Sequence, residues 1–280
     1  MSIIVGVHGI GHQFKGAHLL RSEWLPALQD GLERAGRKLE SPNDFACAFY
    51  GDLFRPAGKS AMLPVYDARD VSDPWEQDLL GELWREAARI DLRVRAPGAN
   101  TKAYVPDVVQ KALRALSQSA FFAGIAENAL IFDLKQVSRY LNEPDVRRKA
   151  RERVKAAISP DTRVVVAHSL GSVIAYEALC DDPASQVDVF VTLGSPLGIS
   201  NLIFNKLDPC PQNGLGMWPP GVKHWVNIAD QGDVVALVKD LGTGFGPNVV
   251  NRSVANSALA HDATRYLTTR ELGEAVALGL

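Results

Sequence analysis

The sequence is poor in cysteine and carries no excess of charge of either sign. Its 280 residues include 3 cysteines, at positions 47, 180 and 210, with no closely spaced pair and no pattern of a disulfide framework. We therefore expect a reducing, cytoplasmic location. The 30 Lys and Arg residues are balanced by 32 Asp and Glu residues, which gives a formal net charge of -2. Because a sequence-wide positive field is missing, nucleic acid is not expected as a partner.

Long hydrophobic runs are missing as well. The longest apolar stretch, Ala120 to Leu134, contains Glu127, Asn128 and Asp133 and is shorter than the roughly 20 apolar residues of a membrane-spanning helix. The N-terminus has neither a basic region nor a cleavage site, so Ile3 to Val7 is interpreted as a core strand rather than as part of a signal peptide. We expect no transmembrane segment, while peripheral contact with lipid stays open.

What is present is the composition of an ordinary globular protein. Apolar residues make up 46% of the chain and charged residues 22%, so a sizeable core can form. The non-alternating, β-branched run Ile3 to Val7 is typical of a parallel strand that is buried on both faces. The sequence then predicts a helix at Leu19 to Leu32 and a second strand at Phe45 to Tyr50. This order of strand, helix and strand indicates the opening of an α/β fold.

The chain between residues 53 and 157 has a different character, because no convincing buried strand occurs there. Helical spacing predicts helices at 75–92, 108–116, 120–141 and 145–158. Several aromatic residues of this insertion either form its packing core or line a channel for an acyl chain: Trp75, Trp84, Phe121, Phe122 and Phe132. We expect residues 1–280 to form a single α/β domain, with residues 53–157 inserted in it as a helical cap.

The α/β pattern resumes after residue 158. Strands are predicted at 164–167, 187–193, 224–228 and 248–250, and helices at 172–179, 263–267 and 271–278. Strands that alternate with helices in this way are typical of parallel sheets. The expected fold class is therefore α/β, with a mostly parallel sheet flanked by helices.

The sharpest local signal is a turn with Ser169 at its apex. The buried strand Val164 to Ala167 runs into an amphipathic helix through a turn of about four residues. Such a turn strains the serine backbone and exposes its hydroxyl, so the residues two before and two after it must be small. Here these residues are Ala167 and Gly171. The alternative interpretation is a serine in an ordinary turn between a strand and a helix.

This segment resembles the nucleophile elbow of the α/β-hydrolase superfamily, and the chain order of the candidate residues resembles that of its serine esterases and lipases. The resemblance covers about 180 residues, namely the first fifty and those after about residue 150. The usual first glycine of the motif is replaced by Ala167, which keeps a small side chain at that position. The resemblance implies an α/β-hydrolase-type fold, a serine nucleophile followed by an acid and a histidine, and no cofactor or metal.

A serine hydroxyl is a weak nucleophile, so it needs a base, and the base needs an acid to orient it. His224 and His261 are the histidines downstream of Ser169. His224 opens a predicted strand, whereas His261 lies in a loop near the start of a helix, which favours His261 as the base. For the acid, the resemblance favours Asp233, which directly precedes a pair of valines. Asp230, at the end of the preceding strand, is the alternative.

Acyl transfer also needs N–H donors that stabilise the developing oxyanion. In the family that the elbow resembles, one donor is the residue after the nucleophile, here Leu170, and the other lies in a loop after an early strand. The segment His8-Gly9-Ile10-Gly11 stands in such a place and resembles the H-G-x-G loop of lipases and esterases. The resemblance implies that Ile10 provides the second amide.

Other interpretations of the glycine-rich segments are weaker. A dinucleotide-binding fingerprint would need a glycine where Phe14 stands. A metal site at His8 and His12 lacks a helix that would align the two side chains. The tripeptide at residues 58–60, Gly-Lys-Ser, resembles the end of a phosphate loop, but Leu53 stands where that loop needs its first glycine.

The sequence thus predicts a serine hydrolase that cleaves carboxylic esters through an acyl-enzyme intermediate. Ser169 is the expected nucleophile, His261 the base and Asp233 the acid, while Ile10 and Leu170 form the oxyanion hole. The substrate is expected to be a small-molecule or lipid ester, with amidase or thioesterase activity as an alternative. A second alternative, from another class, is a non-catalytic binding module that acts through the helical insertion.

Overall fold

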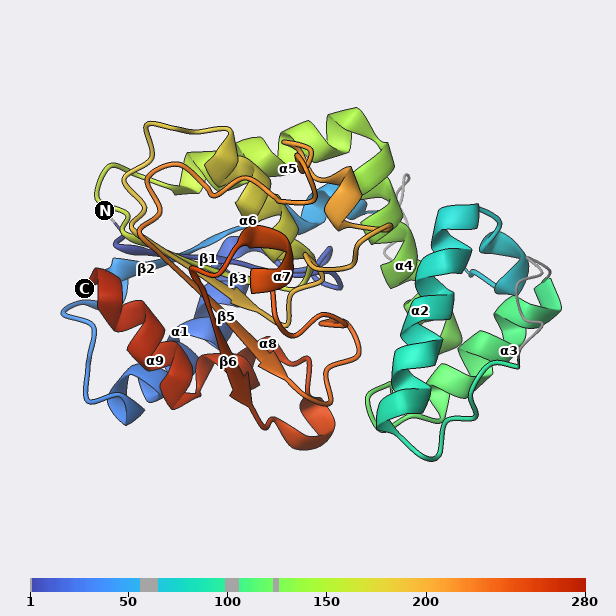
Figure 1. Ribbon diagram of the computed structural model, residues 1–280. Coiled ribbons are helices and arrows are strands. Elements are labelled where there is room, and N and C mark those ends of the chain that lie inside the picture. Colours follow the sequence, from blue (N-terminus) through green and yellow to red (C-terminus); the bar gives the residue numbers. More distant parts are fainter. Residues whose placement is uncertain (1, 56–64, 99–105, 123–125) are drawn as a thin grey trace.

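The computed structural model describes residues 2–55, 65–98, 106–122 and 126–280 (Figure 1). Within these ranges the strands form one six-stranded sheet in the order β2-β1-β3-β4-β5-β6, and each neighbouring pair is parallel. The strands are β1 (Ile4–Val7), β2 (Phe45–Ala48), β3 (Val164–His168), β4 (Val189–Leu193), β5 (His224–Asp230) and β6 (Val249–Val254). The predicted α/β class with a parallel sheet flanked by helices is therefore confirmed. The discarded phosphate loop at residues 58–60 lies outside the described residues.

The helices lie on both faces of this sheet and beside it (Figure 1). They are α1 (Ala17–Arg34), α2 (Pro74–Ile90), α3 (Pro106–Ser117), α4 (Glu127–Asn142), α5 (Pro144–Ala157), α6 (Leu170–Cys180), α7 (Gly242–Phe245), α8 (Ala263–Leu267) and α9 (Arg270–Val276). No helix of the described residues is long and apolar enough to cross a membrane. The predicted helix at 120–141 begins later than expected, because Ser119 accepts a hydrogen bond from the N–H of Phe122 in a turn and α4 starts at Glu127.

The two faces of the sheet carry two separate cores, because successive strand residues point to opposite sides. Val5, Val165 and Phe190 pack with α5 and α6 in one core. Ile4 and Val164 belong to the other core, which includes residues of α1, α8 and α9. Figure 1 shows α5 and α6 above the sheet and α1 and α9 below it. Every residue of β1, β3 and β4 is buried, and these strands show no polar alternation, whereas the edge strand β6 is largely exposed.

Helices α2, α3 and α4 lie beside the sheet rather than on it, as Figure 1 shows. We call residues 74–142, which contain these three helices, the helical segment. Its helices pack on one another through apolar residues such as Leu83, Leu113 and Leu116. The indole N–H of Trp75 donates to the carbonyl of Leu202 at 2.9 Å, which ties α2 to the chain that follows β4. The helical segment therefore lies next to the carboxyl end of β4.

Parallel strands bring their carboxyl ends to one edge of a sheet, and binding sites of α/β proteins gather there. Four of the six strands deliver a residue of interest to this edge: His8 follows β1, Ser169 follows β3, Gly194 follows β4 and Asp233 lies three residues after β5. The sheet order places β1, β3, β4 and β5 next to one another. The site described below is built at this edge.

Candidate active site

Ser169 occupies the turn between β3 and α6 in a backbone conformation that L-residues rarely adopt, with φ 55° and ψ -132°. Its N–H donates to the carbonyl of Leu193 at 3.0 Å, which anchors the turn to the end of β4. A Cβ at Gly171 would lie 2.2 Å from the carbonyl oxygen of His8, so the first turn of α6 packs directly against the chain that leaves β1. The strain predicted for an elbow at Ser169 is thus present, together with the small residue that the turn requires at position 171.

Two hydroxyl groups, those of Ser172 and Ser195, stabilise the strained backbone at Ser169. The Ser172 hydroxyl donates to the carbonyl of Ser169 at 2.6 Å, and its oxygen lies 2.7 Å from the Ser195 hydroxyl. The Ser195 oxygen accepts the N–H of Leu197 at 3.2 Å. Since Ser172 uses its hydrogen on Ser169, Ser195 must donate to Ser172. These hydrogen bonds connect the serine turn to the loop after β4.

His261 lies between Ser169 and Asp233 and makes a hydrogen bond to each. Its Nε2 is 2.9 Å from Ser169 Oγ, and its Nδ1 is 2.8 Å from Asp233 Oδ2. The side chain comes from the loop that joins β6 to α8, immediately before Asp262, which caps the first turn of α8. Three side chains that are far apart in the sequence therefore form one continuous hydrogen-bonded chain.

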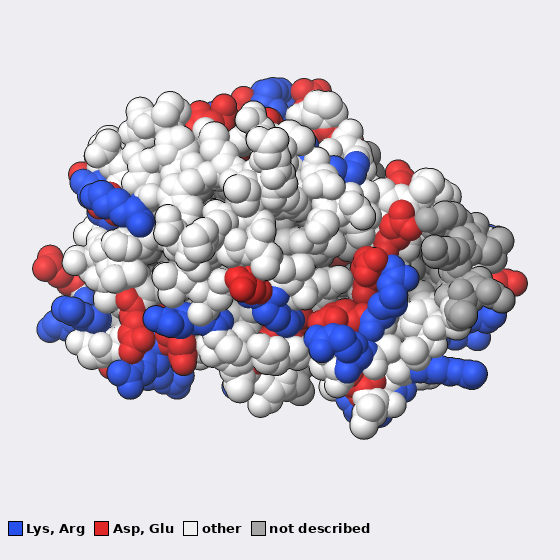
Figure 2. All heavy atoms as spheres, viewed as in Figure 1, with Lys and Arg blue, Asp and Glu red and all other residues white. Residues whose placement is uncertain are grey.

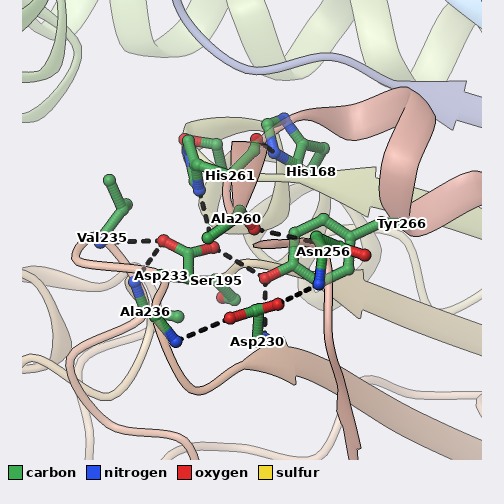
Figure 3. A network of polar contacts seen from close by, with 12 residues as sticks. His168, Ser195, Asp230, Asp233, Val235, Ala236, Asn256, Ala260, His261 and Tyr266 are labelled. Atoms are coloured by element: carbon green, nitrogen blue, oxygen red, sulfur yellow. Dashed lines mark hydrogen bonds and ion pairs between the residues drawn. The ribbon is translucent and has the colours of Figure 1, made fainter. Parts of the chain in front are cut away.

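Asp233 is fully buried and is surrounded by donors (Figure 3). Its Oδ1 accepts the N–H groups of Val235 at 2.9 Å and Ala236 at 3.3 Å, and its Oδ2 accepts the Tyr266 hydroxyl at 2.7 Å as well as His261. Burial alone would raise the pKa of Asp233, but the charge of His261 and the hydrogen bonds from His261 and Tyr266 lower it below its ordinary value. The carboxylate therefore stays ionised at neutral pH and orients Nδ1–H of His261.

The two alternatives left open by the sequence lie elsewhere. Asp230 accepts the N–H of Gly232 at 2.6 Å and the N–H of Asn256, so its carboxylate connects the end of β5 to the chain after β6. Figure 3 shows Asp230 on the far side of Asp233 from His261. His224 is exposed at the first residue of β5, at the opposite end of that strand. The structure thus brings Asp233 and His261, rather than Asp230 and His224, to Ser169.

His168, directly before the nucleophile candidate, holds the backbone of His261. Its ring is buried, and burial lowers its pKa well below the ordinary value, so it is neutral. Its Nε2 lies 2.7 Å from the carbonyl oxygen of His261, which can only accept, so Nε2 carries the proton and donates. The residue therefore fixes the loop that carries the candidate base.

The loop after β1 passes close over Ser169. A Cβ at Gly9 would lie 2.8 Å from Ser169 Cβ, so glycine allows an approach that other residues would block. His8 accepts the N–H of Tyr50 at Nε2, at 3.3 Å, and its Nδ1 therefore donates to the carbonyl of Gly9 at 2.6 Å. Because the peptide group is planar and trans, a fixed Gly9 carbonyl also fixes the direction of the Ile10 N–H.

The two predicted oxyanion donors are unoccupied by protein acceptors. In the part of the chain that the structure describes, no hydrogen bond to protein is made by the backbone N–H of Ile10 or of Leu170. This is expected for Leu170, since the first N–H groups of a helix lack internal acceptors. Both amides belong to segments that flank Ser169 and are free to bind an anionic oxygen.

His8 and His12 lie side by side in the loop after β1. Their rings meet edge to face with centroids 5.3 Å apart. Among the residues with described positions, no group of three or more His, Cys, Asp or Glu side chains could hold a metal ion. Burial lowers the pKa of His8 to about 3 and that of His12 to about 4, so both are neutral at physiological pH.

A cavity of about 410 Å³ lies between the serine turn and the helical segment. Its lining is largely apolar and combines residues of both regions, among them Ile10, Leu83, Phe122, Leu134, Pro196 and Ile199. Phe121 and Phe122 of the insertion do line this cavity, whereas Trp75 and Trp84 donate to backbone carbonyls and Phe132 packs near Tyr66. Lys15 and Glu23, paired at 2.6 Å, form a polar part of the lining.

Sequence reasoning missed three residues that shape this site. Tyr266 donates a hydrogen bond to Asp233. Gly194 lies against the hydrogen bond between Asp233 and His261. Asp133 of α4 lines the cavity. A Cβ at Gly194, where φ is +53°, would lie 2.5 Å from Asp233 Oδ2 and 2.9 Å from His261 Nδ1. The glycine directly after a buried strand was the one available signal for Gly194. No local pattern marks Tyr266 or Asp133.

The charges on the visible face of the molecule are mixed. Figure 2 shows Lys and Arg side chains interspersed with Asp and Glu side chains rather than gathered into a patch of one sign. On α2 the pairs Glu82–Arg85 and Glu86–Arg89 are 2.6 and 2.7 Å apart. This face therefore offers no continuous positive surface for a polyanion.

Comparisons of the chain with protein families, with curated proteins and with solved structures returned no match.

Proposed function

We propose that this protein is a serine hydrolase of the α/β-hydrolase type that cleaves carboxylic esters through an acyl-enzyme intermediate. The observation that carries the proposal is the hydrogen-bonded chain from Ser169 Oγ through His261 to Asp233, with distances of 2.9 and 2.8 Å. A nucleophile, a base and an orienting acid in this order are what acyl transfer to a serine requires. The strained serine turn supports the same function, because strain of this kind concentrates at functional sites.

The first half of the proposed reaction forms the acyl-enzyme. Ser169 Oγ attacks the carbonyl carbon while Nε2 of His261 takes the hydroxyl proton. The N–H groups of Ile10 and Leu170 bind the oxygen that becomes negative. The carbon–oxygen bond to the leaving alcohol then breaks, and His261 returns the proton to that alcohol. Asp233 holds His261 in the tautomer that keeps Nε2 free and stabilises its positive charge.

The second half regenerates the enzyme. A water molecule gives a proton to His261 and attacks the acyl carbon, the oxyanion forms again at the same amides, and Ser169 leaves with the proton from His261. No cofactor or metal takes part in this scheme. A thioester or an amide would follow the same steps, which makes thioesterase and amidase activity the alternative chemistry of the same residues.

The helical segment acts in this proposal as a cap that shapes the substrate site. Its residues Leu83, Phe122 and Leu134 form one wall of the cavity, and the serine turn forms the other. Cavities with apolar walls and few polar groups favour ligands that bury hydrocarbon. We infer that the substrate is a small-molecule or lipid ester with an alkyl portion in this cavity. The free cysteines Cys47, Cys180 and Cys210 fit a cytoplasmic location.

The direct test is covalent labelling of Ser169 with a fluorophosphonate, followed by intact mass measurement. The native protein should gain the mass of one adduct, and the Ser169→Ala variant should not. Ser22→Ala, an exposed serine substitution on α1, is the matched control and should label like the native protein. Native protein that neither labels nor hydrolyses p-nitrophenyl butyrate would contradict the proposal and favour a binding module that has lost catalysis.

A further inference from the structure

The most buried carboxylates in the described part of the chain all have strong donors. A buried charge without partners is costly, so proteins pair it or neutralise it. The pairs are Glu76 with Lys135 (3.0 Å), Glu86 with Arg89 (2.7 Å), Glu177 with Tyr140 (2.5 Å) and Arg147, Asp230 with the N–H of Gly232 (2.6 Å), and Asp233 with His261 (2.8 Å). One further carboxyl group, that of Asp133, differs from these.

Asp133 differs from these carboxylates, because it is partly buried and accepts one side-chain hydrogen bond from the described residues. It lies on α4 in the stripe Leu130, Asp133, Leu134 and Val137, which faces the cavity, and it is the polar member of that stripe. Its Oδ1 accepts the side-chain amide of Gln136 at 3.1 Å. Within the described residues, Oδ2 has no hydrogen-bond partner in the protein. A carboxyl group therefore lies in an apolar wall with one oxygen left for a ligand.

The position of this carboxyl group relates it to the candidate active site. A Cβ at Gly11 would lie 3.9 Å from Asp133 Oδ1, and the N–H of Gly11 donates to Gln136 at 3.4 Å, so Asp133 lies against the loop that carries Ile10. Burial raises the pKa of Asp133 to about 7, while the charge of His261 and the Gln136 hydrogen bond oppose this rise. The carboxyl group and the imidazole are therefore close enough to influence each other across the cavity.

We propose that Asp133 is a substrate-recognition residue that binds a hydroxyl group near the scissile bond, so that the cavity selects hydroxylated esters over plain alkyl esters. This inference rests on the proposed ester hydrolysis at Ser169. A hydroxyl fits better than an ammonium group, because His261 becomes positively charged during the reaction and would repel a second cation in the cavity. Both forms of the carboxyl group can bind a hydroxyl, since the ionised form accepts and the protonated form also donates.

The test compares kcat/KM within two pairs of esters that differ by hydroxyl groups. In the first pair, glyceryl monobutyrate carries hydroxyl groups on its alcohol portion that propyl butyrate lacks. In the second pair, ethyl β-hydroxybutyrate carries a hydroxyl group on its acyl chain that ethyl butyrate lacks. The native protein should prefer the hydroxylated member of at least one pair by about tenfold or more, as expected for a hydrogen bond to a carboxyl group. The pair that shows the preference identifies the side of the ester that Asp133 binds.

Substitutions separate recognition from a structural role of Asp133. Asp133→Leu should reduce the preference to about one, whereas Leu134→Val, which reshapes the same wall without removing a polar group, should leave the preference unchanged. If Asp133 merely holds Gln136 and the loop at Gly11, Asp133→Leu will slow both members of each pair equally. That result would overturn the proposal, as would a native preference near one in both pairs.

A binding measurement keeps the inference independent of turnover. Calorimetry of Ser169→Ala with the same two pairs of esters should show tighter binding of the hydroxylated member in at least one pair, and the added substitution Asp133→Leu should remove the difference. If the native protein neither labels with the fluorophosphonate nor hydrolyses p-nitrophenyl butyrate or any of the four esters, the proposed function fails, while this arm still decides the role of Asp133. Equal affinities within both pairs in Ser169→Ala would refute it.

Discussion

The strand ends of the sheet and the helical segment contribute to the same cavity in different ways. At the strand ends Asp233 has four donors, and the Ser169 backbone is held at its N–H and its carbonyl. The helical segment presents an apolar wall with Asp133 as a carboxyl group whose second oxygen lacks a protein partner among the described residues. Under the proposed function, the strand ends would fix the chemistry and the helical segment would select the substrate.

The largest effect is expected at the two aspartates at the end of β5 and in the loop after it, Asp230 and Asp233. Asp233→Asn should lower kcat about 10⁴-fold, because the amide stabilises the wrong tautomer of His261. Asp230→Asn should keep kcat within about tenfold and instead cost about 1–3 kcal/mol of unfolding free energy, since the N–H of Asn256 loses a charged acceptor. Ester kinetics and urea unfolding measure the two effects. Equal losses of activity in the two variants would remove Asp233 from the role proposed for it.

Gly194 tests how tightly the strand ends fix the geometry. Gly194→Ala places a Cβ 2.5 Å from Asp233 Oδ2, so the contact with His261 must shift, and kcat should fall about 10²-fold or more. Gly36→Ala is the matched control, because Gly36 also has a positive φ, +70°, but nothing within 4 Å of the added atom. Gly36→Ala should lower the free energy of unfolding but leave kcat unchanged. Normal kcat in Gly194→Ala would show that the site tolerates displacement.

The Asp133 carboxyl group of the helical segment is tested by the pH dependence of the free energy of unfolding. Its native pKa of about 7 lies above the unfolded value, so the native state binds more protons and the carboxyl destabilises the fold increasingly as pH rises from about 4 to about 7. Asp133→Asn should therefore raise the unfolding free energy by about 4 kcal/mol near pH 8 and by almost nothing below about pH 4. Urea unfolding across this range measures the difference. A constant effect at all pH values would contradict the raised pKa.

The smallest effect is expected from the apolar wall. Leu83→Phe narrows the cavity, so kcat/KM for p-nitrophenyl octanoate should fall about tenfold relative to the acetate ester. Leu92→Phe changes a fully exposed leucine next to the same helix and serves as the control. Comparable ratios in the two variants would mean that Leu83 does not contact the acyl chain. That result would also weaken the proposal that the helical segment shapes the substrate site.

The sequence predicted the strands well because burial on both faces leaves continuous β-branched runs, as at Val164 to Ala167. It also predicted that Ser169 ends a strand, which the turn chemistry dictates locally. The meeting of Asp233 and His261 could be expected from the resemblance alone, since two loops after different strands carry no local sign of their distance. The hydrogen bonds of Tyr266 to Asp230 and Asp233, and the position of Asp133 against the loop at Gly11, depend on contacts between segments far apart in the chain, which no window of sequence contains.

Tyr266 carries a consequence beyond its contact with Asp233. Its oxygen already accepts the N–H of Asp230 at 2.9 Å, so its hydrogen is directed toward Asp233 Oδ2, 2.7 Å away. The phenol has no freedom to turn when charge develops on the imidazole. In water, dipoles around a carboxylate would have to rotate at that moment, whereas here the alignment was completed when the chain folded.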